Sequence, residues 1–126
     1  DWLQQYNTNS KICWVAGFSF GAWIAMQLLM RRPEINGFIS ISPPANLRDF
    51  SFLAPCPSSG FIVHGDKDNI ASFDSSKILV EKLQKQKKVD IKFKPIKGAD
   101  HFYESYSSEF ENSINEYITQ IIETKY

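Results

Sequence analysis

Nineteen consecutive residues without a formal charge, 12–30, form the longest uncharged run of the chain, and a serine stands between two glycines inside it. Gly17, Ser19 and Gly21 give the pattern G-x-S-x-G, with apolar residues on both sides. This order predicts a strand that turns sharply into a helix, with Ser19 at the apex of the turn. Because such a turn strains the backbone of its apex residue, the residues two positions away on either side are expected to be small.

A serine at such an apex is suited to act as a nucleophile. Its side chain projects from the end of the strand, and the N-terminus of the following helix favours negative charge beneath it. One G-x-S-x-G pattern is a modest signal, because glycine and serine are common in turns. The interpretation of Ser19 as a nucleophile therefore depends on motifs in the rest of the chain.

The same uncharged run admits a second interpretation, a helix that spans a membrane. It is long enough to cross a bilayer, and Gly17 and Gly21 also form G-x-x-x-G, which favours helix association in membranes. Against this interpretation, glycine and serine crowd the middle of the run and Gln27 interrupts its second half. The rest of the chain alternates between strand and helix patterns, which also favours a strand, turn and helix at residues 12–30 over a membrane-spanning helix.

Apolar patterning alternates between short β-branched or aromatic runs and longer helical ones. It predicts strands at residues 12–16, 37–41, 60–64 and 89–94, and helices at 20–32, 73–87 and 103–125. This alternation predicts an α/β fold, a parallel β-sheet of about four strands with flanking helices. The length of 126 residues suits one domain over residues 1–126.

The last predicted helix carries an apolar stripe that we expect to pack on the sheet as core. Its members recur every fourth residue and two further side chains widen the face. They are Phe102, Tyr106, Phe110, Ile114, Ile118 and Ile122, with Tyr117 and Ile121 beside them.

Acidic and histidine side chains follow two later predicted strands. Asp66 and Asp68 come after residues 60–64, and Asp100 and His101 come after residues 89–94. The chain order Ser, Asp, His, each at the end of a strand, suits nucleophilic catalysis. Asp100 is disfavoured as the acid, because it adjoins the histidine in sequence and neighbours in an extended loop point apart. Asp68, at the end of a separate strand, is therefore the preferred acid, and Asp66 is the reserve. His64, in a His-Gly turn, is interpreted as a structural histidine.

Together, residues 17–22, 63–68 and 98–102 resemble the nucleophile, acid and histidine motifs of the α/β-hydrolase superfamily. Residues 42–47 and 49–53 add a likeness to a bacterial branch of small uncharacterised serine hydrolases. The resemblance implies Ser19 as nucleophile, Asp68 as the orienting acid and His101 as the general base. It also implies hydrolysis of a small-molecule carboxylic ester or related acyl bond, with an oxyanion held by the backbone N–H of Phe20.

By the same resemblance, the chain looks like the C-terminal half of a hydrolase, and a second oxyanion donor is expected upstream of Asp1. The predicted strand from Ile12 to Ala16 is then expected at a sheet edge without edge protection. We expect it to pair with the missing half or with a second copy. The alternative function is a weakly active or inactive fragment that works by association with another chain.

The loop at residues 42–59 is expected at the carboxyl end of the sheet, where ligands bind in parallel α/β folds. Its Phe50, Phe52 and Leu53 are candidates to line an acyl pocket, and a small packed core or short helix is the alternative.

Charge and cysteine content narrow the classes of partner. Fourteen acidic and fourteen basic residues balance, which argues against a protein dedicated to nucleic acid or to a membrane surface. Seven lysines between Lys82 and Lys97 are interpreted as a solvated face. Cys13 and Cys56 indicate no disulfide framework and favour a reducing, cytoplasmic location. No cofactor is predicted, and the two histidines and two cysteines match no metal-ligand spacing.

Overall fold

The computed structural model describes residues 13–53 and 56–125 and places four strands in one parallel sheet. The sheet order follows the chain: β1 (Trp14–Phe18), β2 (Gly37–Ile41), β3 (Gly60–Gly65) and β4 (Ile91–Ile96). The helices are α1 (Phe20–Arg31), α2 (Phe73–Gln84) and α3 (Ser107–Lys125), and a short 3-10 helix, η1 (Ser51–Leu53), precedes β3. The predicted α/β fold is confirmed.

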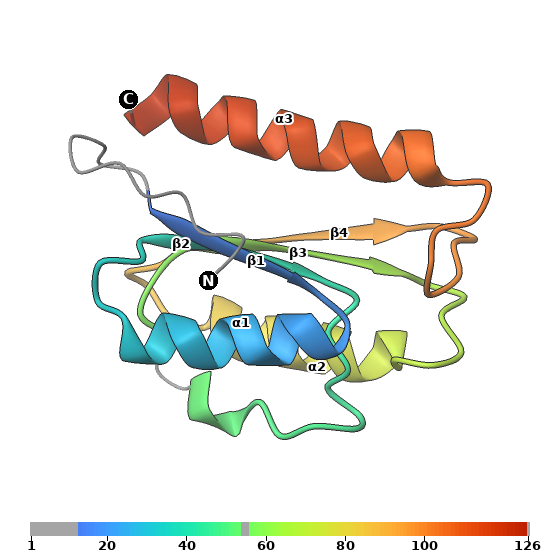
Figure 1. Cartoon of the computed structure of the whole chain (residues 1–126), viewed down its shortest axis with the longest axis horizontal. Helices are drawn as coiled ribbons and strands as arrows, with labels where there is room; N and C mark the ends of the chain where they lie inside the picture. Colours follow the sequence, from blue (N-terminus) through green and yellow to red (C-terminus); the bar gives the residue numbers. More distant parts are fainter. Residues whose placement is uncertain (1–12, 54–55, 126) are drawn as a thin grey trace.

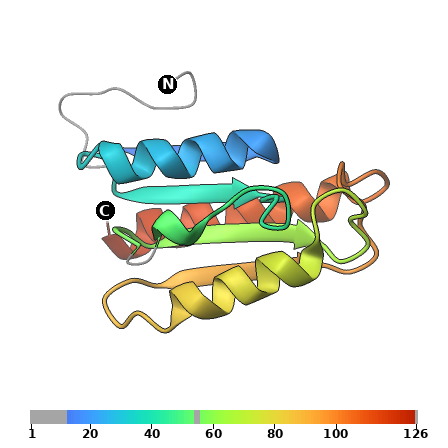
Figure 2. The ribbon, with the colours of Figure 1, turned by 90° about the horizontal axis from the view of Figure 1, so that it is seen from below.

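Helices cover both faces of this sheet. Figure 1 shows α3 on one face, and α1 and α2 on the other, with η1 on the same side as α1 and α2. All pairings between neighbouring strands are parallel, so the carboxyl ends of the strands meet along one edge of the sheet (Figure 2). The loops that leave this edge carry the chemically active side chains identified in the sequence.

The two central strands are the most deeply buried. Every residue of β3 is buried, as are the first four residues of β2. The outer strand β4 is more exposed: Ile91 and Ile96 at its ends are buried, whereas Lys92 and Lys94 between them are exposed. Strands covered on both faces require nearly continuous apolar sequence, as in β2 and β3.

Two strands lie two residues later than predicted. β1 continues through Phe18 because the N–H of Ser19 still donates to the carbonyl of Ile41, at 2.7 Å, so the ladder extends to the turn. β4 continues to Ile96 and includes Pro95, which lacks an N–H but is tolerated in an outer strand. Residue 12, the predicted start of the first strand, lies outside the described residues.

Helix boundaries follow local backbone signals. α1 ends at Arg31, because Arg32 is extended before Pro33. α2 begins after Ser72, whose side chain accepts a hydrogen bond from the N–H of Ser75, and ends three residues earlier than predicted. α3 begins at Ser107, four residues later than predicted, because Tyr103 and Ser105 adopt positive φ angles that a right-handed helix excludes.

Each face of the sheet has its own apolar core. On one side α1, α2 and η1 pack over Val15, Phe38 and Ile62, and on the other α3 packs over Phe61 and Val63. The predicted stripe of α3 is largely correct: Tyr106, Phe110, Ile114, Tyr117, Ile118 and Ile121 belong to this second core. Phe102 and Ile122 are exceptions, exposed by 60% and 45%, because Phe102 precedes the helix and Ile122 lies off its buried face.

Among the described residues, no helix has the length and apolar character needed to cross a membrane. Residues 13–30 divide instead between β1, the turn at Ser19 and α1. The spanning helix considered for residues 12–30 is therefore wrong over the part that the structure describes.

The two glycines of the turn differ in their steric constraint. A Cβ at Gly17 would overlap the carbonyl group of Gly21 and lie 2.8 Å from the backbone nitrogen of Ala22, whereas a Cβ at Gly21 meets nothing within 4 Å. The expectation that both must be small is correct for Gly17 alone.

We therefore predict that Gly17→Ala lowers the free energy of unfolding by about 2 kcal/mol or more, because the overlap is with backbone that cannot move aside. Gly21→Ala is the matched control and should be neutral or stabilising by up to about 1 kcal/mol, since alanine favours a helix. Urea unfolding followed by circular dichroism measures both. Equal effects of the two substitutions would contradict this account of the turn.

Candidate active site

Ser19 lies at the junction of β1 and α1 in a strained backbone conformation. Its φ of 57° and ψ of −121° are unusual for a residue other than glycine, and its N–H is held by the carbonyl of Ile41 on the neighbouring strand. The close approach of Gly17 to the first turn of α1 allows this geometry. The Ser19 side chain is thereby directed away from the sheet, at its carboxyl edge.

Asp68 occupies the loop after β3, and its side chain is fully buried. Oδ1 accepts hydrogen bonds from the N–H groups of Ile70 and Ala71, both at 2.8 Å. The loop is held in turn by Lys67, whose N–H donates to the carbonyl of Ala99 at 2.9 Å. Two backbone donors on one oxygen hold the carboxylate in place, so the loop fixes the orientation of Asp68.

His101 joins the other two side chains. Its Nδ1 lies 2.6 Å from Oδ2 of Asp68, and its Nε2 lies 2.9 Å from Oγ of Ser19. A carboxylate only accepts, so Nδ1 carries the proton and Nε2 presents a lone pair to the serine hydroxyl. The structure thus brings the three predicted residues into one hydrogen-bonded row, although Ser19 and His101 are 82 positions apart.

The loop that carries His101 is anchored by Tyr103. The hydroxyl of Tyr103 lies 2.8 Å from Oγ of Ser42 and donates to the carbonyl of Val63 at 3.3 Å. Burial raises the pKa of Tyr103 well above its usual range, so the hydroxyl keeps its proton. Ser42, like Tyr103, has a positive φ, and the pair ties the ends of β2 and β3 to the histidine loop.

His64 lies directly beneath the carboxylate and is fully buried. Its Nε2 is 2.8 Å from the carbonyl oxygen of Ala71 and 3.1 Å from Oδ2 of Asp68. Burial lowers the pKa of His64, against the opposing effects of the Ala71 carbonyl and the Asp68 charge. The contact with Asp68 was missed in the sequence, where the spacing of four residues between His64 and Asp68 was the available signal.

The other two carboxylates considered as the acid hold loops elsewhere. Oδ1 of Asp66 accepts from the N–H of Gly98 at 2.7 Å, and Oδ1 of Asp100 accepts from the N–H of Glu104 at 2.9 Å. Among residues 13–53 and 56–125, no three His, Cys, Asp or Glu side chains are grouped to hold a metal ion.

Aromatic rings surround the row of hydrogen bonds. Phe18 and Phe102 lie 5.1 and 4.9 Å from the imidazole of His101, measured between ring centres, and both are exposed. The half-exposed ring of Phe20, the residue after Ser19, lies under the guanidinium of Arg48, 5.0 Å from the ring centre. The N–H of Phe20 belongs to the first turn of α1, where backbone donors have no partner within the helix. Sequence patterning gave no signal for Phe18, and it placed Phe102 in the core stripe of the last helix instead of beside His101.

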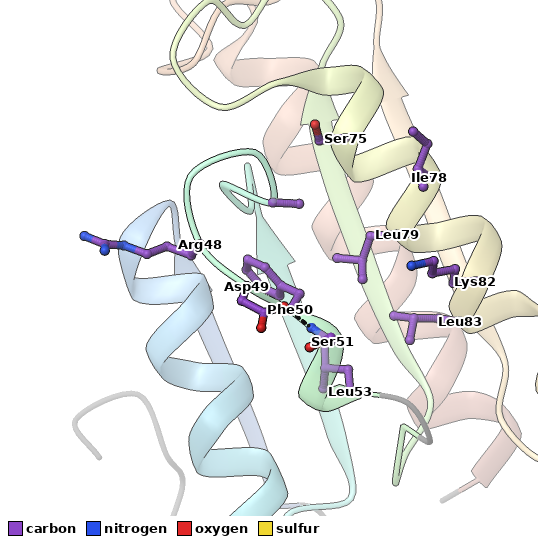
Figure 3. A pocket seen from close by; sticks show the side chains of 11 residues that line it. Arg48, Asp49, Phe50, Ser51, Leu53, Ser75, Ile78, Leu79, Lys82 and Leu83 are labelled. Carbon is purple, nitrogen blue, oxygen red and sulfur yellow. Dashed lines mark hydrogen bonds between the residues drawn. The ribbon is translucent and has the colours of Figure 1, made fainter.

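Phe50, Phe52 and Leu53 lie in the other core, on the side of α1 and α2. Phe50 and Leu53 are buried, and Phe52 packs against the same cluster as part of η1. Phe50 and Leu53 line an open groove of about 320 Å³ between residues 48–53 and α2 (Figure 3). None of Ser19, Asp68 and His101 lines this groove. The expected alternative, a short packed helix, describes these residues, and their position gives no support to an acyl pocket.

Comparison with known proteins identifies a matching family and a similar protein. A model of the dienelactone hydrolase family matches residues 1–121. An uncharacterized protein of Rickettsia prowazekii (strain Madrid E) is 55% identical over 125 residues, 96% of this chain and 52% of that protein.

Solved structures share the fold. A protein of unknown function from Agrobacterium tumefaciens superimposes with a TM-score of 0.89 at 51% identity, over 93% of this chain and 54% of the other. An alpha-beta serine hydrolase homologue from Coxiella burnetii superimposes with a TM-score of 0.69 at 30% identity, over 79% of this chain and 45% of the other. The chain therefore spans about half the length of the relatives it matches.

The buried His64 predicts how stability depends on pH. The pKa of His64 is lowered from its ordinary 6.5 in the folded chain, so the unfolded chain binds a proton first as the pH falls. The free energy of unfolding should therefore decrease as the pH is lowered through the region just below about 6.5. Urea unfolding at several pH values measures it, and His64→Gln, which cannot titrate there, should show a shallower dependence. The same slope in both proteins would contradict the prediction.

Proposed function

Because this chain belongs to the dienelactone hydrolase family, we propose that it is a serine hydrolase that cleaves a carboxylic ester or related acyl bond. The observation that carries the proposal is the row of hydrogen bonds from Asp68 through His101 to Ser19. Serine hydrolase homologues among the similar structures support the same class of reaction.

In the first step, Oγ of Ser19 forms a bond to the carbonyl carbon of the substrate while Nε2 of His101 takes the hydroxyl proton. Asp68 stabilises the resulting imidazolium through its hydrogen bond to Nδ1. The carbonyl oxygen becomes an oxyanion, and the N–H of Phe20 at the start of α1 stabilises its charge. The strained turn thus holds nucleophile and oxyanion donor next to each other in the chain.

In the second step, the tetrahedral intermediate expels the alcohol, which receives the proton from Nε2 of His101. An acyl group now esterifies Ser19. Water then attacks the same carbonyl carbon, with His101 again as base, and releases the carboxylic acid and the free serine. The half-buried position of Ser19 leaves its oxygen accessible to substrate and water.

Substrate and partners of the whole protein are also proposals. We propose a small-molecule acyl substrate, no cofactor and a cytoplasmic location, because a sequence with two cysteines does not suggest a disulfide framework. β1 is an outer strand of the described sheet, and the relatives extend well beyond the matched region. We therefore propose that β1 pairs with a further segment of the protein or with a second copy. A weakly active or inactive chain that acts by association with another chain is the second candidate function.

Labelling with a fluorophosphonate probe tests the hydrolase proposal. The chain should react at a single site that maps to Ser19 by mass spectrometry, and Ser19→Ala should abolish the reaction. Ser113→Ala, which removes another partly buried serine hydroxyl, is the control and should label fully. A chain that is folded by circular dichroism yet does not label would overturn the proposal and favour association as the function.

Asp68→Asn tests the role of the carboxylate. It nearly preserves shape but removes the negative charge that fixes the imidazole tautomer, so turnover of an activated ester should fall by about ten-thousandfold with little change in KM. Steady-state kinetics with 4-nitrophenyl acetate measures both constants. Asp66→Asn is the matched control, because Asp66 binds only a loop N–H in the structure described here. A similar loss of turnover in the two variants would count against Asp68 as the acid.

A further inference from the structure

One carboxylate oxygen is shared by two imidazoles. Oδ2 of Asp68 lies 2.6 Å from Nδ1 of His101 and 3.1 Å from Nε2 of His64, and all three side chains are buried. The mechanism above uses only His101. His64 is therefore a buried titratable group, in contact with the acid, that the proposed reaction leaves without a role.

The hydrogen-bond partners of His64 determine its tautomer. Nε2 faces two acceptors, the carbonyl oxygen of Ala71 and Oδ2 of Asp68, and so must carry the proton. Nδ1 is buried and has no hydrogen-bond partner among the described residues. Burial opposes a second proton. A neutral ring with its one N–H directed at both acceptors is the state that fits these contacts.

These contacts close the acid loop on itself. Ala71 donates its N–H to Oδ1 of Asp68 and accepts from His64 through its carbonyl, so both ends of residues 68–71 meet the same imidazole. His64 belongs to β3, the most buried strand, and its ring also forms an edge-to-face contact with Phe73 at the start of α2. The histidine thus connects a rigid strand to the carboxylate that orients His101.

We propose that His64 is a positioning residue of the active site: as a neutral Nε2–H donor it holds the carboxylate of Asp68 and the carbonyl of Ala71, and so fixes the orientation of His101. This proposal rests on the proposed hydrolase function. It goes beyond a structural histidine in the core, because it assigns the effect on reactivity to one N–H group rather than to the volume of the ring.

Two amide substitutions of His64 distinguish the effect of its Nε2–H donor from the effect of its ring volume. The amide nitrogen of glutamine can take the place of Nε2, whereas the shorter asparagine places its amide near Nδ1. His64→Gln should therefore keep the contact with Asp68, and His64→Asn should lose it. Val80→Ala is the control for stability alone, because Val80 lies on α2 and is buried in the apolar core.

The readout is the rate of fluorophosphonate labelling at saturating probe, together with the probe concentration that gives half of that rate. We expect His64→Asn to lower the saturated rate by about tenfold to a hundredfold, with the half-saturating concentration nearly unchanged. His64→Gln should recover most of the rate, and Val80→Ala should leave it unaltered. A wild-type rate in His64→Asn, or an equal loss in both His64 variants, would overturn the proposal.

Nitrogen-15 NMR of the unmodified chain provides a test that needs neither activity nor a variant. The proposal requires His64 to be protonated on Nε2 and bare on Nδ1 at neutral pH. A proton on Nδ1, or on both nitrogens, would overturn it even if the variants fail to fold. A chain that does not label at Ser19 but shows the Nε2–H tautomer would refute the hydrolase function while retaining the contact between His64 and Asp68.

Discussion

The buried carboxylate of Asp68 is the group on which the candidate site depends. An ionised carboxylate without solvent is costly unless donors surround it, and here two backbone N–H groups and two imidazoles do so. The backbone N–H groups hold Oδ1 and the imidazoles contact Oδ2, so the carboxylate is oriented to direct Nε2 of His101 at Ser19. The contacts that satisfy the buried carboxylate are therefore the same contacts that orient it toward His101.

The parallel sheet supplies the frame for this arrangement. Since all four strands run in the same direction, the loops after β1, β3 and β4 leave the sheet at the same edge. The side chains of Ser19, Asp68 and His101 on these loops are therefore close enough to form hydrogen bonds. Backbone strain is concentrated at the same edge, at Ser19, Ser42 and Tyr103. Each strained residue is held by a hydrogen bond to a neighbouring strand or loop, so the rigidity of β2 and β3 maintains the spacing between serine and histidine.

Sequence patterns predicted the order and type of every major element, because burial in a parallel sheet demands apolar runs separated by helical stripes. They also predicted which three side chains meet, because Ser19, Asp68 and His101 each follow a strand. The late start of α3 was missed, since the apolar stripe begins at Phe102 and gives no sign of the positive φ angles at Tyr103 and Ser105. The four-residue spacing of His64 and Asp68 was the one signal for their contact, whereas the contact of His64 with Ala71 and the rings of Phe18 and Phe102 beside His101 depend on how the loops fold.

Proton NMR of the hydrogen bond between His101 and Asp68 tests the central claim most directly. A proton held between Nδ1 and a buried carboxylate, at 2.6 Å, should give a strongly downfield resonance that exchanges slowly with water. The account predicts that this resonance persists in Ser19→Ala, which leaves the bond intact, and vanishes in Asp68→Asn. Its absence from the unmodified chain, or its survival in Asp68→Asn, would contradict the arrangement from which the proposed reaction follows.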